Sequence, residues 1–238
     1  MEISFTRWRV YRECPWKYKL LFLDGRRIPP TPKGSFGVSL HRALEAWTMG
    51  GDDSLDALLE ALDAHWQDYG YGDEAEEARW RSKAERVLTR FQAEAVSRRS
   101  RVVASEKEFV WRLGDHQVRG MIDRVDQRPD GAYEVVDYKT GPDAPTAEQV
   151  AADPQLRFYA LGARRGLGIA PAFVTVEAVT AGATVTAAYD GEGEEALAAD
   201  VAAAAAAIEA GRFTPEMSFC PRCDFRRDCV FSSAKNAP

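Results

Sequence analysis

The four cysteines of this 238-residue chain stand in a pattern that ties its two ends together. Cys14 lies near the N-terminus, whereas Cys220, Cys223 and Cys229 form a C-x2-C-x5-C run near the C-terminus. This spacing is typical of four sulfur ligands around one metal centre. A fold that satisfies it must bring the first helix and the C-terminal tail to the same place.

The composition allows a hydrophobic core and gives no sign of a membrane segment. Hydrophobic residues make up 45% of the chain, and no stretch approaches the roughly 18 apolar residues that a membrane helix needs. The N-terminal segment MEISFTRWRV is polar and lacks the apolar run of a secretory signal. We therefore expect a cytoplasmic protein without membrane association, in which thiols stay reduced and bind metals rather than form disulfides.

Charge is distributed unevenly along the chain, although the net charge is −6. Residues 1–33 hold eight Lys/Arg against three Asp/Glu, and residues 79–101 hold eight against two. Residues 51–78 hold ten Asp/Glu and no Lys or Arg. Two basic regions can therefore follow a phosphate backbone despite the acidic total, although such runs are equally compatible with solvated helix faces.

Hydrophobic periodicity and turn signals divide the chain into helical and extended segments. Helices come first, followed by a three-stranded antiparallel meander, a helix, two strands and a last helix. This order predicts an α/β sandwich around a mixed sheet, in one domain. The segment 25–37 is expected to be a loop. One helix, or two short helices that meet at Pro15, is expected at 6–22. Further helices are expected at 39–48, 54–66, 73–99, 146–163 and 194–209, and strands at 102–113, 117–126, 133–140, 173–180 and 184–189.

The central strands carry a candidate catalytic constellation. Asp137 and Lys139 are two residues apart on a strand, so their side chains point to the same face. Asp123 lies on the preceding strand, and a tight turn at 128–131 can place it beside Asp137. Two carboxylates in an apolar strand context suit a hard divalent cation such as Mg²⁺ or Mn²⁺. A lone D-x-K pair, however, is a weak signal, because solvated pairs of this kind are common on edge strands.

Five motifs in order make the pattern specific. G-M-I-D-R-V-D at 120–126 and V-V-D-Y-K-T-G at 135–141 follow G-x-x-x-H at 37–41, and Q-x-x-x-Y at 155–159 comes next. The one-plus-three arrangement of cysteines is the fifth. Together they resemble the PD-(D/E)xK nuclease superfamily, and most closely its branch with the RecB and AddB nuclease domains and the Cas4-like proteins. The resemblance implies a restriction-endonuclease-like core at about 102–190 within a single domain of residues 1–238.

The resemblance also implies roles for individual residues. It makes His41, Asp123, Asp137 and the backbone carbonyl of Tyr138 metal ligands, and Lys139 the catalytic lysine. Gln155 and Tyr159, one helical turn apart, would contact the substrate. Glu108 matches more weakly a glutamate that often precedes this core, and it is as readily explained as an exposed strand carboxylate.

Four thiolates suit either Zn²⁺ or an iron–sulfur cluster. A C-x2-C pair alone favours zinc, but zinc sites usually draw on two such pairs. The resemblance implies a [4Fe–4S] cluster held by Cys14, Cys220, Cys223 and Cys229. By analogy with disulfide closure, a centre that links the chain ends could contribute about 4–5 kcal/mol of stability. Arg222, Arg226 and Arg227 lie within the cysteine run and can present a basic surface to DNA.

The function that the resemblance implies is a metal-dependent DNA nuclease, an exonuclease on single-stranded DNA ends that hydrolyses phosphodiesters. The sequence has no G-x-x-x-x-G-K-[ST] motif, so any translocation along DNA must come from a helicase partner. The alternative is an accessory subunit that binds and trims DNA ends for a larger machine, either a CRISPR integrase complex or a recombination complex in DNA repair. A nuclease fold that only binds is disfavoured, because the carboxylates and the lysine are all present.

Overall fold

The computed structural model describes residues 1–97 and 100–235 and divides into two compact units. The central unit comprises Pro30–Phe109 and Met121–Glu192, and the terminal unit comprises Met1–Pro29, Val110–Gly120 and Gly193–Pro238. The candidate active-site residues His41, Asp123, Asp137, Lys139, Gln155 and Tyr159 lie in the first, and all four cysteines lie in the second. The single-domain organisation remains a prediction.

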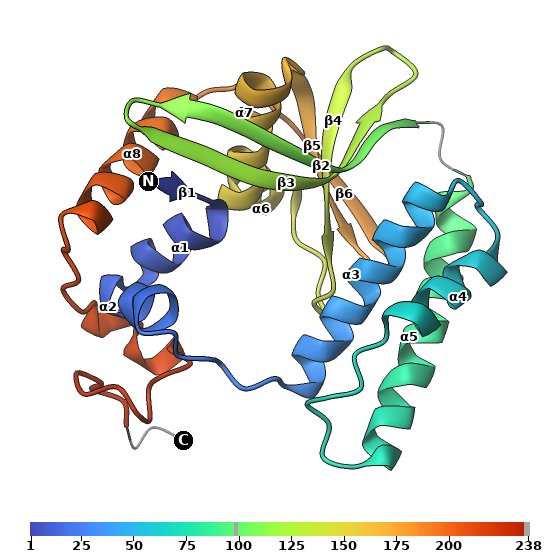
Figure 1. The fold of residues 1–238 in the computed structure, drawn as a ribbon. Coiled ribbons are helices and arrows are strands. Elements are labelled where there is room, and N and C mark those ends of the chain that lie inside the picture. Colours follow the sequence, from blue (N-terminus) through green and yellow to red (C-terminus); the bar gives the residue numbers. More distant parts are fainter. Residues whose placement is uncertain (98–99, 236–238) are drawn as a thin grey trace. The chain divides into compact units, whose positions relative to one another are not determined.

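A mixed six-stranded sheet forms the framework of the described chain, with the strand order β1-β3-β4-β5-β6 and β2 paired with β3 (Figure 1). β3 pairs with β4 and β5 with β6 in antiparallel fashion, whereas β4 and β5 run parallel. The predicted α/β fold with a mixed sheet is confirmed. The strands are β1 (Glu2–Ile3), β2 (Arg101–Leu113), β3 (His116–Gln127), β4 (Tyr133–Lys139), β5 (Pro171–Ala178) and β6 (Ala183–Ala188).

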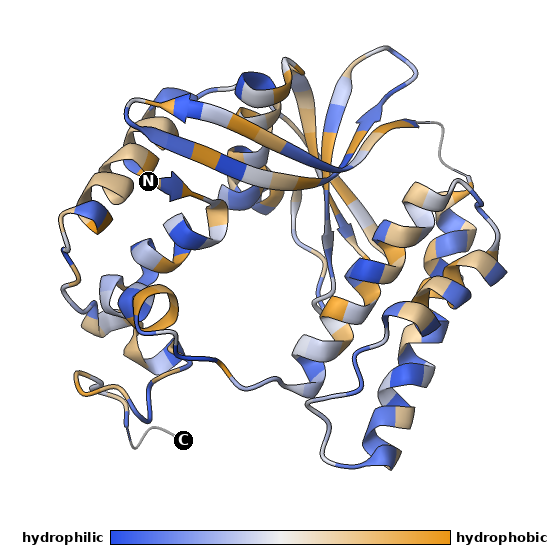
Figure 2. Cartoon of the chain, in the orientation of Figure 1, coloured by the Kyte–Doolittle hydropathy of each residue, from blue (hydrophilic) through white to orange (hydrophobic). Residues whose placement is uncertain are grey.

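Alternation along the strands follows from the two faces of the sheet. β2 and β3 form a long hairpin whose residues alternate between hydrophobic and hydrophilic (Figure 2), as expected of strands with one face turned to water. β4 instead is buried along its middle, including Val135, Val136 and Asp137. Carboxylates on β4 are therefore held in an apolar environment.

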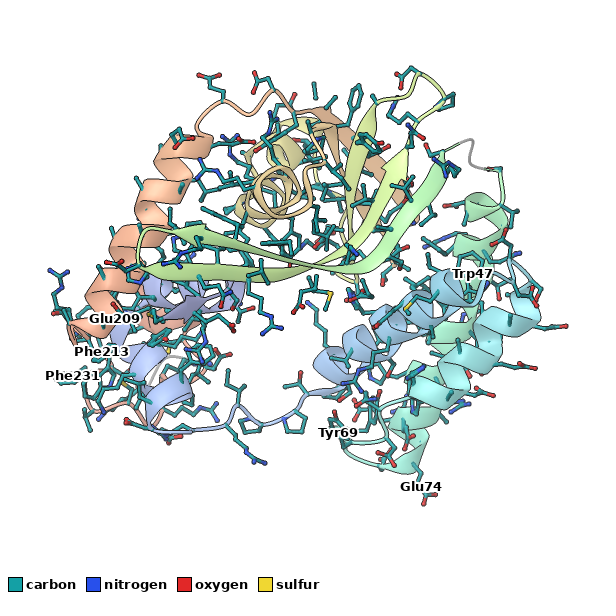
Figure 3. All side chains as sticks on the ribbon, turned by 45° about the horizontal axis from the view of Figure 1, so that its top comes forward. Trp47, Tyr69, Glu74, Glu209, Phe213 and Phe231 are labelled. Carbon is teal, nitrogen blue, oxygen red and sulfur yellow. The ribbon has the colours of Figure 1, made fainter. Side chains whose placement is uncertain are left out.

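Three helices of the central unit pack side by side. They are α3 (Pro32–Gly50), α4 (Leu55–His65) and α5 (Glu74–Ala95). Their buried faces join Tyr138 of β4 and Val179 in one core cluster, to which α3 contributes Trp47 near its C-terminal end (Figure 3). α5 was expected to continue to residue 99, but it ends at Ala95, and Arg98 and Arg99 lie outside the described residues.

α3 is longer than predicted, and the loop before it is correspondingly shorter. Thr31 caps the helix by accepting a hydrogen bond from the Gly34 N–H, and Pro32 occupies the first turn. Proline is suited to that position because its fixed φ is helical and its missing N–H would have no partner there. Gly34 and Gly37 interrupt the hydrophobic pattern, so the pattern did not indicate that the helix begins at Pro32.

The helix expected at 146–163 is two helices, α6 (Ala147–Ala152) and α7 (Pro154–Leu167). Asp153 separates them and caps α7 by accepting hydrogen bonds from the N–H groups of Gln155 and Leu156. Pro154 cannot continue a helix from α6 but readily begins a new one. The break places Gln155 in the first turn of α7.

The terminal unit gathers both ends of the chain. α1 (Phe5–Glu13) and α2 (Pro15–Tyr18) meet at Cys14-Pro15 as predicted, and a π-helical segment (Lys19–Leu23) follows. α8 (Glu194–Glu209) contacts α1 and β1, and a 3₁₀ helix (Met217–Arg222) begins the cysteine run. None of the helices in the described residues is long and apolar enough to cross a membrane.

Candidate active site and cysteine centre

Two buried aspartates lie at the point where the β3–β4 ladder ends. The ladder pairs Arg124 with Val136, so Asp123 and Asp137 lie one step further along the same two strands. Asp123 is 6% exposed and Asp137 is 1% exposed. Beyond the ladder, the Tyr138 N–H donates to Asp123 Oδ2 at 3.0 Å. The predicted approach of the two aspartates is therefore present, and a backbone amide fixes one of them.

Lys139 connects Asp137 to helix α7. Its Nζ lies 2.7 Å from Asp137 Oδ2 and donates to Gln155 Oε1 at 2.6 Å. Gln155 Nε2 in turn donates to Tyr159 Oη at 3.1 Å. The structure thus brings Gln155 and Tyr159 to the lysine, as the motif spacing predicted. Their contact with a substrate remains a prediction.

His41 and Glu106 complete the cluster, and Glu106 was not among the residues predicted from the sequence. His41 Nε2 on α3 lies 3.5 Å from Glu106 Oε1 and 3.7 Å from Asp123 Oδ1. Of the described residues, these three form the one group of His, Cys, Asp or Glu whose ligand atoms all lie within 4.8 Å of one another. The set of donors is therefore larger than the predicted ligands.

Glu106, not Glu108, is the β2 glutamate that reaches this cluster. Glu108 is exposed. Glu106 has a φ of 44° and is the one non-glycine residue with positive φ in the described chain, a conformation that is uncommon outside glycine. Glu106 and Glu108 are two residues apart, so a regular strand would place both side chains on the same face. The sequence pattern therefore could not indicate which of the two reaches the cluster.

Burial and mutual repulsion raise the pKa values of the two aspartates. Burial, and then the charge of Asp137, raise the pKa of Asp123 from 3.8 to about 7, although His41 and the Tyr138 N–H oppose the shift. Burial also raises the pKa of Asp137, against the opposing charge of Lys139. The hydrogen bond to Glu106 is the main cause that raises the pKa of His41 from 6.5 to about 8.

A divalent cation fits this donor set. Since the folded-state pKa values of Asp123 and His41 lie above their ordinary values, both groups stabilise the metal-free fold at low pH. That contribution is lost as the pH rises through about 7 for Asp123 and about 8 for His41. A bound cation relieves the repulsion between the two carboxylates. Asp137 Oδ2 makes no hydrogen bond of regular geometry, and carboxylate oxygens with one imidazole suit Mg²⁺ or Mn²⁺.

Gly37 lies one helical turn before His41, at a close contact between α3 and the residue that follows β4. A Cβ at this position would lie 2.8 Å from Thr140 Oγ1, at the end of β4. Residues four apart lie on the same side of a helix, so the close approach at Gly37 also brings His41 to the strand that carries Asp137. The glycine is therefore explained by the close contact between α3 and the Thr140 side chain just after β4 rather than by helix conformation.

The four cysteines converge in the terminal unit. Cys14, Cys220, Cys223 and Cys229 are buried free thiols that line one small cavity. The Glu216 N–H donates to Cys14 Sγ at 3.3 Å, and burial raises the pKa of Cys223. The predicted meeting of the chain ends is therefore observed, and four sulfurs directed into one cavity fit a metal centre.

An ion-pair bridge and aromatic side chains support the cysteine centre. The buried Lys17 of α2 pairs with Glu13 at 3.0 Å and with Asp224 of the cysteine run at 2.9 Å. The Trp16 ring meets Phe231 edge-on, with centroids 4.8 Å apart, and Phe231 is labelled in Figure 3. Both contacts join the first helices to the C-terminal tail.

Comparison with known proteins establishes the family. A family model described as the PD-(D/E)XK nuclease superfamily matches residues 2–230. The chain therefore belongs to the PD-(D/E)XK nuclease superfamily, as the motifs around Asp123 and Asp137 predicted. Its place in the RecB, AddB and Cas4-like branch remains a prediction.

Other comparisons add little. No curated protein matches the chain. A solved structure described as "Crystal structure of SSO0001" is 13% identical, and the alignment covers 91% of this chain and 94% of that chain with a TM-score of 0.37. A likeness of that size supports no argument about function.

The contact at Gly37 gives a test of the site. We expect Gly37→Ala to weaken Mn²⁺ binding about 10-fold, because residues that position ligands typically change metal affinity by that much. The double variant Gly37→Ala/Thr140→Ala should recover most of the affinity, since the clashing Oγ1 is gone. Calorimetric titration measures both, with Thr140→Ala alone as the control. Wild-type affinity in Gly37→Ala, or no recovery in the double variant, would contradict the packing argument.

Proposed function

We propose that the protein is a metal-dependent DNA nuclease that hydrolyses phosphodiesters. The observation that carries this proposal is the convergence of His41, Glu106 and Asp123 beside the Asp137–Lys139 pair, on strands of a PD-(D/E)XK fold. Perturbed titratable groups with specific charged partners are typical of functional sites.

In this proposal His41, Asp123, Asp137 and the Tyr138 carbonyl hold the cation, and Glu106 joins them as a further donor. A bound Mg²⁺ or Mn²⁺ supplies Lewis-acid polarisation of a phosphate oxygen and lowers the pKa of water. The buried aspartates keep the site acidic enough to attract a cation and dry enough to strengthen its charge interactions.

Lys139 acts on the reacting phosphate. Asp137 and Gln155 hold its ammonium group from two sides, so little side-chain freedom is lost when a substrate binds. A fixed positive charge stabilises negative charge that develops in the transition state. Gln155 and Tyr159 then have two roles in this proposal: they orient Lys139 and they contact the DNA.

The substrate proposed is a single-stranded DNA end, cleaved as an exonuclease would cleave it. The basic N-terminal segment and the arginines of α5 supply positive charge for a phosphate backbone, and the resemblance to RecB and Cas4-like nucleases supports strand ends as the target. Because the chain has no nucleotide-binding motif for translocation, a helicase or a CRISPR integrase complex is the proposed protein partner.

For the cysteine centre we propose a [4Fe–4S] cluster. Cys14, Cys220, Cys223 and Cys229 are buried and line one cavity, so their four sulfurs suit either Zn²⁺ or an iron–sulfur cluster. The resemblance to RecB and Cas4-like nucleases with a four-cysteine cluster favours the iron–sulfur cluster.

The nuclease proposal predicts that cleavage depends on Lys139 and Asp137. End-labelled single-stranded DNA with Mn²⁺ should be shortened by the wild type, whereas Lys139→Met and Asp137→Asn should lower the rate by about 100-fold or more. Asp143→Asn, an exposed aspartate on the loop after β4, is the matched control and should cleave normally. Full activity in both site variants would refute the assignment.

The cluster proposal predicts iron and sulfide in protein purified without oxygen. Elemental analysis should find about four iron atoms and four sulfides per chain, together with visible charge-transfer absorption. Cys223→Ser should lose both signals and the control Ser218→Ala should keep them. One zinc per chain without iron, or an intact iron signal in Cys223→Ser, would overturn the proposal.

A further inference from the structure

A buried arginine lies on the sheet face opposite the two aspartates. Arg124 follows Asp123 on β3, so its side chain points to the other side of the sheet. Its Nε donates to Asp126 Oδ1 at 2.9 Å and its Nη2 to Glu177 Oε1 at 3.1 Å. Its Nη1 donates to Tyr138 Oη at 2.7 Å. Every nitrogen of the guanidinium therefore has a partner within the central unit.

Tyr138 links this arginine to the candidate metal site by two further contacts. Its ring meets the His41 ring edge-on, with centroids 6.1 Å apart. Its N–H is the donor that fixes Asp123 Oδ2. One residue thus contacts two of the proposed ligands, while its hydroxyl is held by Arg124.

The amide of Tyr138 lies just beyond the paired part of β4 on the β3 side. The β3–β4 ladder ends at Arg124 and Val136, so on the β3 side the N–H of residue 138 is satisfied by a side chain instead of a strand. A contact of this kind is sensitive to small shifts of the strand end. The Arg124–Tyr138 hydrogen bond restrains that shift from the opposite face.

Burying an arginine together with two carboxylates carries a large cost in desolvation free energy. Taking these charges out of water costs energy that their attraction repays only with good geometry, and apolar side chains of similar volume often stabilise a fold equally well. The network holds its orientation firmly because all its partners are directional. A residue that positions metal ligands requires a fixed orientation of this kind.

We propose that Arg124, held by Asp126 and Glu177, is a positioning residue that anchors Tyr138 and thereby fixes Asp123 and His41 for cation binding. The inference rests on the proposed function for the identity of the cation. The anchoring of Tyr138 can be measured in the metal-free protein as well.

Tyr138→Phe is the test, because it removes the hydroxyl and leaves the ring and the backbone N–H. Arg124 keeps Asp126 and Glu177, so its charge remains paired. We expect amide hydrogen exchange at residue 138 of the metal-free protein to accelerate about 10-fold or more, while Val135 stays protected. Calorimetry should show Mn²⁺ affinity reduced by about 10-fold to 100-fold.

Thr175→Val is the matched control. Thr175 is buried on the same sheet face, and its hydroxyl contacts Glu134 and Thr186 rather than Tyr138. This variant should lose stability but keep both the exchange rate at residue 138 and the Mn²⁺ affinity. A structural role alone would make the two variants behave alike.

The outcomes separate this inference from the proposed function. Unchanged exchange at residue 138 in Tyr138→Phe, or equal changes in Thr175→Val, would overturn the positioning role whatever the wild type binds. Exchange at residue 138 that accelerates in Tyr138→Phe but not in Thr175→Val supports the anchoring of Tyr138. A fall in Mn²⁺ affinity in the same variant supports the role of this anchor in positioning the metal ligands. A wild type that binds no Mn²⁺ and cleaves no DNA would refute the nuclease proposal instead.

Discussion

The closeness of two buried aspartates at the end of the β3–β4 ladder is the constraint on which the rest of the central unit depends. Antiparallel pairing places Asp123 beside Asp137, and burial removes both carboxylates from the water that would solvate their charge. Unpaired charges in such surroundings are expensive. Lys139, His41 and the Tyr138 N–H each compensate part of this charge, and a divalent cation would compensate the remainder.

The surrounding elements are shaped by this requirement. Gly37 lets α3 approach the end of β4 so that His41 reaches Asp123. The break before Pro154 starts α7 where Gln155 can hold Lys139. α3, β4 and α7 thus each supply partners to this cluster. The cluster lies within the residues that match the nuclease superfamily, so the fold and the proposed chemistry are consistent with each other.

Much of this arrangement could be predicted from the sequence, because short-range patterns determine it. The strand order and the tight turn at 128–131 were enough to place Asp123 beside Asp137, and the cysteine spacing was enough to bring the chain ends together. Glu106 could not be predicted, because its inward turn depends on a positive φ that no residue pattern signals. The Arg124 network was missed because it joins three strands whose register only the folded sheet defines.

The central claim is that one cation is held by His41, Asp123 and Asp137, and anomalous scattering from Mn²⁺ in crystals of the protein tests it most directly. The account predicts an anomalous peak within bonding distance of His41 Nε2 and of one oxygen from each aspartate. It also predicts that Asp123→Asn removes the peak. No peak at this position, at Mn²⁺ concentrations that support cleavage, or a peak only among carboxylates other than Glu106, Asp123 and Asp137, would contradict the account.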